Sequence, residues 1–266
     1  MILVFSGTGN TLAVARLLAD ELGETVREFT PDELTTPEKA AIGSADNQII
    51  WMFPTYSWGV PPVILNLISK SKFNFNPEAS HFMVTTAGDD SGMIADQWRK
   101  ALSRRGISGS SAYSVQMPNT YTMMKGFDVD SPEVIESKLS AMPARVKEIA
   151  SRISDATPGD DLVKGSWPRS KTRIVYPWFK RYMITAKGFH TNDRCTRCGW
   201  CIRHCPLANI TADSSGHPQW GKRCTMCERC YHGCPSHAIE WRKATRGKGQ
   251  YTQFINLLKP SAHSKK

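Results

Sequence analysis

Eight cysteines constrain the fold of this chain of 266 residues most, because all of them fall into two copies of one spacing. Each copy has the pattern C-x2-C-x2-C-x3-C and is followed by a proline, Pro206 or Pro235. The first copy contains Cys195, Cys198, Cys201 and Cys205, and the second contains Cys224, Cys227, Cys230 and Cys234. Because no cysteine is left over, one kind of binding is expected to use the whole set.

Three kinds of cysteine chemistry compete for this pattern. Zinc sites usually take two separate ligand pairs, and zinc does not require three cysteines within 7 residues. Disulfide frameworks belong mostly to small secreted domains, whereas this chain is not small and starts without a signal-peptide pattern. Iron–sulfur clusters do use this spacing. The pattern therefore favours iron–sulfur clusters, with zinc as the alternative.

The repeat extends beyond the cysteines, since PLANI at 206–210 corresponds to PSHAI at 235–239. Residues 191–241 thereby resemble the two-cluster bacterial ferredoxins. The resemblance implies a small α+β domain with two [4Fe–4S] clusters, in which the fourth cysteine of each copy binds the cluster of the other copy. It assigns one cluster to Cys195, Cys198, Cys201 and Cys234. It assigns the other cluster to Cys205, Cys224, Cys227 and Cys230.

A phosphate-binding loop is predicted near the N-terminus. Residues 1–5 are an apolar run typical of a buried strand, and residues 12–18 have apolar side chains at helical spacing. The loop between them consists of Ser6, Gly7, Thr8, Gly9, Asn10 and Thr11. A strand, a loop rich in glycine and hydroxyl groups, and a helix N-terminus together direct N–H and O–H donors at an anion.

Three phosphate loops can be compared with this one. A nucleoside triphosphate loop requires a lysine that is absent here. The dinucleotide loop requires a third glycine where Leu12 stands, although Glu28 lies where a ribose-binding acid would fall. The pattern [ST]-x-[ST]-G-x-T, the FMN phosphate loop of flavodoxins, is fully matched. Its fixed positions are Ser6, Thr8, Gly9 and Thr11.

Residues 1–154 as a whole resemble flavodoxin. Further strands are predicted at 25–29, 48–53, 82–86 and 111–117, and a helix is predicted to begin at Ser131-Pro132. The resemblance implies an α/β fold, a doubly wound sheet of five parallel strands in the order 2-1-3-4-5, with FMN outside the carboxyl ends of the strands. Two further loops would then bind FMN. They consist of Pro54, Thr55, Tyr56, Ser57, Trp58 and Gly59, and of Thr86, Ala87, Gly88 and Asp89.

Aromatic residues are unevenly placed in these loops. Tyr56 and Trp58 are expected to stack on the flavin ring, with ordinary core packing as the alternative. The loop at 87–92 lacks the aromatic residue that many flavodoxins have there. We therefore expect the other face of the flavin to be either open to a partner or covered by another part of the molecule, with Tyr121 and the cysteine-rich region as the candidates.

Taken together, the two halves resemble the flavodoxin–ferredoxin fusion family. The resemblance implies an FMN domain at 1–154, a linker with an amphipathic helix at 155–190, a cluster domain at 191–241 and a basic extension at 242–266. It implies an electron-transfer protein, acting either on a substrate or redox partner at the flavin, or as a pure carrier. No catalytic residue is predicted, because the chain has no arrangement suited to covalent catalysis.

The segment at 171–187 interleaves aromatic and basic residues. Such a pattern can bind nucleic acid or a membrane surface, but we expect a helix that packs its apolar stripe against both domains. The tail at 242–266 is expected to be a surface extension. His204, His232 and His237 lie among the cysteines and are expected to face solvent.

Charge is divided unequally along the chain, whose formal net charge is +10. Residues 1–160 contain 14 Lys and Arg against 19 Asp and Glu, whereas residues 161–266 contain 20 against 5. An acidic redox partner is therefore expected, and a homodimer is a further option. A zinc protein that binds nucleic acid is the least favoured reading. The sequence shows no apolar stretch of membrane-spanning length, and we expect a cytoplasmic protein.

Overall fold

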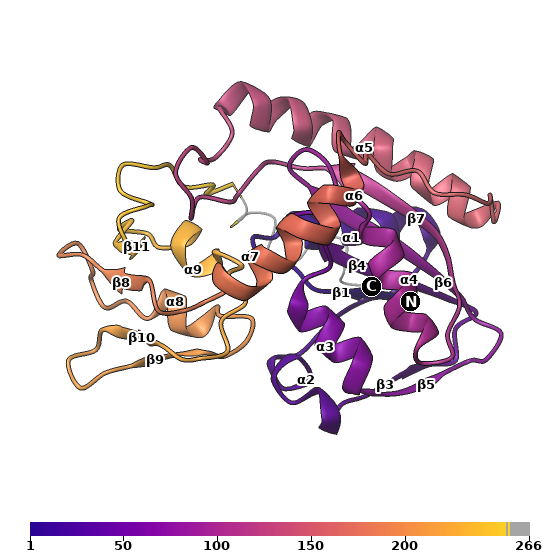
Figure 1. Cartoon of the computed structure of the whole chain (residues 1–266), viewed down its shortest axis with the longest axis horizontal. Coiled ribbons are helices and arrows are strands. Elements are labelled where there is room, and N and C mark those ends of the chain that lie inside the picture. The colour runs from indigo at the N-terminus through magenta and orange to yellow at the C-terminus, as the bar shows by residue number, and fades with distance from the viewer. Residues whose placement is uncertain (254, 256–266) are drawn as a thin grey trace.

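The computed structural model, which describes residues 1–253 and 255, has a parallel sheet of five strands at its centre (Figure 1). The strand order is β2-β1-β4-β6-β7, and every neighbouring pair is parallel. The strands are β1 (Ile2–Val4), β2 (Val26–Glu28), β4 (Gln48–Pro54), β6 (Ser80–Ala87) and β7 (Gly109–Gln116). The predicted five parallel strands and their order are confirmed, and this order is that of flavodoxin-like sheets.

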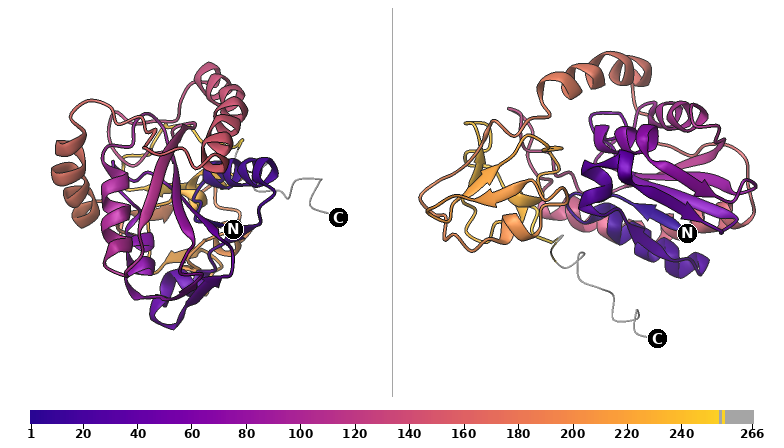
Figure 2. Two further views of the ribbon diagram at one scale, coloured as in Figure 1. Left: turned by 90° about the vertical axis from the view of Figure 1, so that its right-hand side faces the viewer. Right: turned by 90° about the horizontal axis from the view of Figure 1, so that it is seen from below.

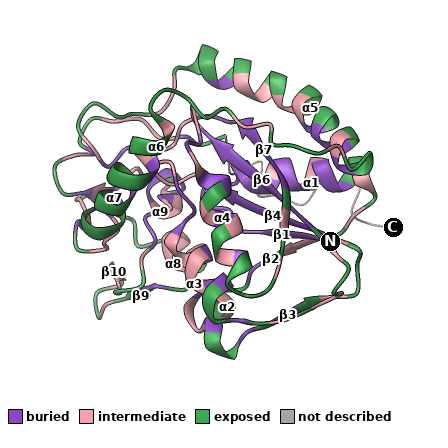
Figure 3. Ribbon diagram, turned by 45° about the vertical axis from the view of Figure 1, so that its right-hand side comes forward, coloured by how far each residue is buried: buried purple, intermediate pink, exposed green. Residues whose placement is uncertain are grey.

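Helices cover both faces of the sheet, because alternate residues of each strand point to opposite sides. On one face, Ile2 and Val4 pack with α1 (Asn10–Leu22) and α5 (Pro132–Ser154). On the other face, Leu3 packs with the helices that follow β4 and β6. These are α3 (Pro62–Lys70) and α4 (Ile94–Ser103), with α2 (Pro31–Thr35) and the short 3-10 turn η1 (Pro37–Lys39) beside them. The buried strands lie between helices that combine buried and exposed residues (Figure 3).

Two features of this part were not predicted. A separate parallel pair joins β3 (Ala41–Ser44) to β5 (Lys72–Phe75). The start of the expected linker is docked on the edge of the sheet, where Asp161 N–H donates to the Ala112 carbonyl and Ser114 N–H donates to the Asp161 carbonyl. This contact covers the edge strand β7, which would otherwise present unpaired backbone groups.

The cysteine-rich part lies beside the sheet (Figure 2) and consists of two hairpin-like halves. Its strands form two antiparallel pairs, β8 (Phe189–Thr191) with β11 (Ile239–Trp241) and β9 (Ile210–Ala212) with β10 (Pro218–Trp220). Each half contains one short helix, α8 (Trp200–Arg203) or α9 (Arg229–His232). The ferredoxin-like nature of this part stays a prediction.

One helical segment, which we call the bridging helix, joins the two parts. It comprises α6 (Pro168–Ser170), the π-helical turn η2 (Lys171–Val175) and α7 (Tyr176–Tyr182). Tyr176 and Phe179 are buried, as expected for an inward stripe, whereas Trp178 and Tyr182 are exposed. The prediction that the apolar stripe packs inward is therefore correct for only part of the helix.

The start of the C-terminal tail differs from its prediction as a surface extension. Tyr251 is fully buried, and its N–H donates to His232 Nδ1 at 3.1 Å. Lys248 Nζ donates to the carbonyl oxygens of Thr122 and Met124, which belong to the first half of the chain. The surface prediction is therefore wrong for residues 248–251, whereas Arg242, Lys243, Arg246 and Gly247 are exposed as predicted. The remainder of the tail, apart from Ile255, lies outside the described residues.

No helix in the part of the chain that the structure describes combines the length and the apolar character needed to cross a bilayer.

One buried histidine in the sheet predicts an acid-sensitive contribution to stability. Trp51 Nε1 donates to His81 Nδ1 at 3.1 Å, and burial lowers the pKa of His81 to about 4. The unfolded chain binds this proton near pH 6.5, so stability present above pH 6.5 is lost as the pH falls toward 4. The slope of the free energy of unfolding against pH stays below ~1.4 kcal/mol per pH unit, which is the limit for one proton. Urea unfolding at pH 7 and pH 5 should show a smaller loss for His81→Gln than for wild type; equal losses would contradict the prediction.

Candidate functional site

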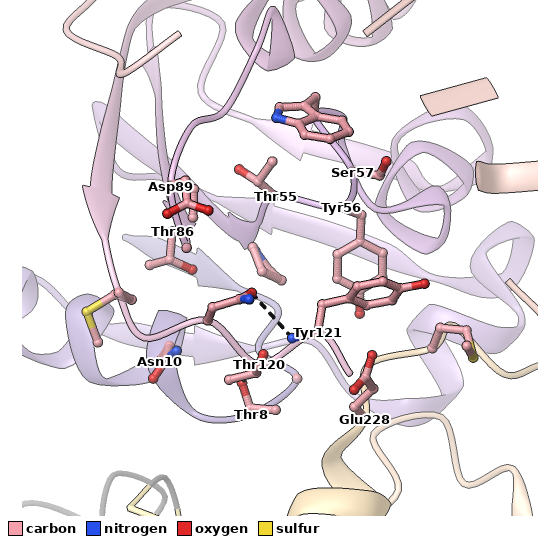
Figure 4. A pocket seen from close by; sticks show the side chains of 18 of the residues that line it. Thr8, Asn10, Thr55, Tyr56, Ser57, Thr86, Asp89, Thr120, Tyr121 and Glu228 are labelled. Atoms are coloured by element: carbon pink, nitrogen blue, oxygen red, sulfur yellow. Dashed lines mark hydrogen bonds between the residues drawn. The ribbon is translucent and has the colours of Figure 1, made fainter. Parts of the chain in front are cut away.

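A pocket of about 290 Å³ opens where strands β1, β4 and β6 end (Figure 4). All three predicted flavin loops line it, apart from Ser6, Gly9 and Gly59. The members that do line it are Gly7, Thr8, Asn10, Thr11, Pro54, Thr55, Tyr56, Ser57, Trp58, Thr86, Ala87, Gly88 and Asp89. Residues far apart in the sequence thus meet at the carboxyl edge of the sheet, where α/β folds bind ligands.

The first loop has the features of an anion cradle. Gly9 caps α1 with a left-handed φ of 84°, and its N–H donates to Ser6 Oγ at 3.1 Å. This turn leaves the N-terminus of a 13-residue helix beside the hydroxyl of Thr8 and the buried amide of Asn10. The Oδ1 atom of Asn10 is buried without a hydrogen-bond partner in the described part of the chain. The loop therefore offers both donors and one unused acceptor to a ligand.

Ser6, Gly9 and Gly59 do not line the pocket but support the loops that do. Ser6 holds the turn through Gly9, as described above. Gly59 pairs with Tyr56 in an isolated bridge, and a Cβ at Gly59 would lie 2.5 Å from the ring of Tyr176. These residues therefore support the loops that line the pocket without lining it themselves.

Tyr56 and Trp58 occupy different environments. Burial, with smaller effects from Cys227 and Cys224, raises the pKa of Tyr56 well above its ordinary value. Trp58 has a left-handed φ of 66° and lies under Lys171 Nζ, 4.9 Å from the ring centroid. Its carbonyl accepts a hydrogen bond from Thr172 at 2.8 Å. The bridging helix therefore fixes the loop that contains Trp58.

Several residues that line the pocket were not predicted from the sequence. Asn10 Nδ2 donates to the Pro118 carbonyl, which fixes the segment after β7 against the first loop. The further lining residues come from that segment, the bridging helix and the second cysteine repeat. They are Asp90, Met117, Pro118, Asn119, Thr120, Tyr121, Met124, Phe127, Val175, Trp178, Phe179, Met226, Cys227 and Glu228. Tyr121 was one of two candidates for the missing aromatic wall, and both it and the cysteine-rich part do line the pocket.

Glu228 is the most unusual of the missed residues. It is buried with a left-handed φ of 60°, at the position where the first repeat has Gly199 with a φ of 70°. Its Oε2 accepts hydrogen bonds from the Thr122 N–H and hydroxyl at 3.0 and 2.8 Å, and its Oε1 has no partner among the described residues. Burial raises the pKa of Glu228 to about 8 despite these bonds. A strained, buried carboxyl group that lines a pocket is typical of a functional position.

The first loop and the second cysteine repeat are in direct contact. A Cβ added at Gly7 would lie 2.9 Å from Cys227 Cβ and 3.0 Å from its carbonyl oxygen. Arg229 donates hydrogen bonds to the carbonyl oxygens of Ser6 and Gly7, and another to that of His204. Only glycine allows the loop to approach this closely. Arg229 thus ties the pocket loop to both cysteine repeats.

The eight cysteines are free thiols and gather into two groups. One small cavity is lined by Cys195, Cys198, Cys201 and Cys234, and another is lined by Cys205, Cys224, Cys227 and Cys230. Each group takes three cysteines from one repeat and the fourth from the other. Backbone N–H groups donate to the Sγ atoms of Cys205, Cys224 and Cys234 at 3.3–3.4 Å.

The buried surroundings of these cysteines disfavour the charged thiolate form. Burial, followed by the nearby Cys205, raises the pKa of Cys227 to about 12, and Cys230 is raised well above its ordinary value. Within residues 1–253 and 255, no three His, Cys, Asp or Glu side chains lie close enough to share a single metal ion.

None of the three neighbouring histidines is as exposed to solvent as expected, and His204 and His237 are partly buried. His232 is fully buried, where its Nε2 lies 2.7 Å from the Thr120 carbonyl and its Nδ1 accepts from Tyr251. Burial lowers its pKa to about 4, so its ring is neutral near pH 7. The expectation failed because the ring joins the segment after β7 to the C-terminal tail, a contact that local sequence does not reveal.

Comparisons with known proteins add little. No family model and no curated protein matches the chain. A solved structure, rubredoxin oxygen:oxidoreductase from the anaerobe Desulfovibrio gigas, is similar with 13% identity and a TM-score of 0.28. The match covers 56% of this chain and 34% of that one, so the chain spans about a third of its length. A TM-score this low supports no conclusion about function.

Proposed function

We propose that this chain is an electron-transfer protein that holds FMN in the pocket and two [4Fe–4S] clusters on its eight cysteines. The observation that carries the proposal is that Cys227 lines both the pocket and the second cysteine-lined cavity. A flavin site and a cluster site would therefore share a wall within one chain. Bound FMN exchanges two electrons and each cluster exchanges one.

The residues of the pocket fit FMN. The loop at 6–11 would hold the phosphate through N–H and hydroxyl donors at the N-terminus of α1. Tyr56, Trp58 and Tyr121 give the pocket aromatic walls suited to a flat ring. The volume of about 290 Å³ is near the lower end of the range for small-molecule and cofactor sites.

The cysteine groups fit cubane clusters better than single ions. In a cluster each thiolate binds a different iron atom, so the four sulfur atoms surround a volume and need not converge on one point. The N–H groups that point at Sγ atoms would also stabilise cluster charge. Thiols with strongly raised pKa values require a compensating positive charge before they ionise, and iron supplies it.

Cofactor content tests the proposal directly. Protein purified without oxygen should contain about one FMN and about eight iron atoms per chain, the latter with matching acid-labile sulfide. Elemental analysis and flavin fluorescence after denaturation would measure both. Zinc in place of iron, or a chain that cannot be loaded with FMN, would overturn it.

A pure carrier and an enzyme differ in what approaches the pocket, which is a redox protein for the carrier and a small-molecule substrate for the enzyme. The part of the wall formed by Met124, Phe127 and Trp178 lies outside the three flavin loops, and it is where a substrate or a redox partner would approach bound FMN. The kinetics with which small acceptors oxidise the reduced protein would separate the two, since an enzyme should be saturated by its substrate, whereas a carrier should show no saturable oxidation by a small molecule.

A further inference from the structure

The bridging helix has a second apolar stripe, which is largely exposed. We call it the outer stripe, and it consists of Ile174, Trp178 and Tyr182 in the helix together with Trp167, the residue that precedes it. Their exposed fractions are 80%, 69%, 46% and 59%. The inward stripe, by contrast, is formed by the buried Tyr176, Phe179 and Met183. The helix is therefore apolar on two sides, and only one side is covered within the described chain.

The segment of the chain that carries the outer stripe is basic. No Asp or Glu occurs between Asp161 and Asp193, whereas seven Lys and Arg do. Six of these are exposed: Lys164, Arg169, Arg173, Lys180, Arg181 and Lys187. The seventh, Lys171, is paired with Asp90 at 2.7 Å. The segment thus combines exposed aromatic and aliphatic side chains with unneutralised positive charge.

This surface lies at the edge of the pocket. Trp178 belongs to both the outer stripe and the pocket wall, and Val175, which is 38% exposed, also lines the pocket. The helix runs along the outside of the molecule in both views of Figure 2. A partner that covers the outer stripe would therefore meet the pocket at its rim.

We propose that the outer stripe docks the protein on an anionic membrane surface, with the bridging helix lying in the plane of the interface. Tryptophan and tyrosine side chains favour the boundary between headgroups and acyl chains, and nearby Lys and Arg are attracted to anionic lipids. This inference goes beyond the proposed electron-transfer function and does not depend on which cofactors are bound.

Other occupants fit the surface less well. A second copy related by a two-fold axis would set this basic segment against itself, where like charges repel. Single-stranded nucleic acid would stack on the aromatic rings, but it would leave Ile174 unused at 69% exposure. A lipid interface uses the aromatic, aliphatic and basic residues together.

Vesicle sedimentation with the anaerobically purified full chain tests the proposal. We expect binding to phosphatidylcholine vesicles that contain phosphatidylserine, weakened by salt, and little binding to phosphatidylcholine alone. Trp167→Ser with Ile174→Ser should weaken binding at least about 10-fold, as should Arg173→Glu with Lys180→Glu. None of these four residues lines the pocket, so FMN and iron content should not change.

Matched controls lie on other helices. Val134→Ser removes a comparably exposed apolar side chain from α5, and Lys100→Glu with Arg104→Glu reverses two exposed charges at α4. Both should bind vesicles like wild type, after allowance for net charge. The proposal is overturned if the full chain ignores anionic vesicles, or if control and stripe variants bind equally. It is also overturned if the stripe substitutions instead abolish a dimer seen by light scattering, binding to single-stranded DNA, or binding to an acidic redox protein.

Discussion

Replacing Arg229 with glutamine is expected to weaken FMN binding about 100-fold while the iron content stays near eight per chain. Arg229 is the donor to the carbonyl oxygens of Ser6, Gly7 and His204, and it fixes the pocket loop against the second cysteine repeat. Hydrogen bonds from a charged group contribute about 1.5–3 kcal/mol each, and a 100-fold change corresponds to ~2.7 kcal/mol. Flavin fluorescence titration of the flavin-depleted protein would measure the effect.

Two further variants make this test specific. Arg229→Lys should restore FMN affinity only in part, because an ammonium group cannot reproduce the planar guanidinium that reaches several carbonyl oxygens. Arg203→Gln is the matched control, since Arg203 donates to the carbonyl of Cys198 in the first repeat. Its FMN affinity should stay within about two-fold of wild type. An unchanged FMN dissociation constant in Arg229→Gln would contradict the assigned link between the two parts.

Cys205→Ala is expected to lower the iron content from about eight to about four per chain, and to remove the cluster of the second repeat. The reason is spatial, because Cys205 lines the cavity of Cys224, Cys227 and Cys230 although it belongs to the first repeat in sequence. Cys224→Ala should therefore leave the same residual signal in electron paramagnetic resonance as Cys205→Ala. Cys201→Ala should leave the other cluster and a different signal.

Iron analysis and spectra of the reduced proteins would check this pairing. Thr196→Ser, an exposed change between two ligands, should keep all iron and serves as the control. Matching residual spectra for Cys205→Ala and Cys201→Ala would show that each repeat binds its cluster with its own four cysteines, contrary to the expectation.

Much of the sheet was predictable because its signals are local. The apolar run at 1–5 and the hydroxyl-rich loop after it specify a buried strand, a turn and a helix within about 20 residues. The N-cap at Ser131 was also predicted, and its side chain accepts from the Val134 N–H. Parallel pairing of β3 with β5 was not predicted, because each strand has only 4 residues and local sequence does not show which strand it pairs with.

The tail and the buried histidine were predicted wrongly for a related reason. Tyr251 and His232 are each polar enough to face solvent, but they contact each other, His232 contacts Thr120, and Tyr251 packs with Ile135. The contact between His232 and Thr120 joins segments more than 100 residues apart, so neither composition nor periodicity contains it. The exposed face of the bridging helix was missed likewise, because spacing shows an apolar stripe but not what covers it.

The sequence by itself determined which side chains are available for chemistry: eight cysteines in two repeats, and a loop whose hydroxyl pattern matches an FMN phosphate site. Both features depend only on residues that lie close together in the sequence. Only the tertiary structure decided that Gly7 lies against Cys227, that Arg229 holds them together, and that Glu228 lines the same pocket. The physical reason is that close packing between segments some 220 residues apart depends on the docking of two separately folded surfaces, which no local pattern encodes.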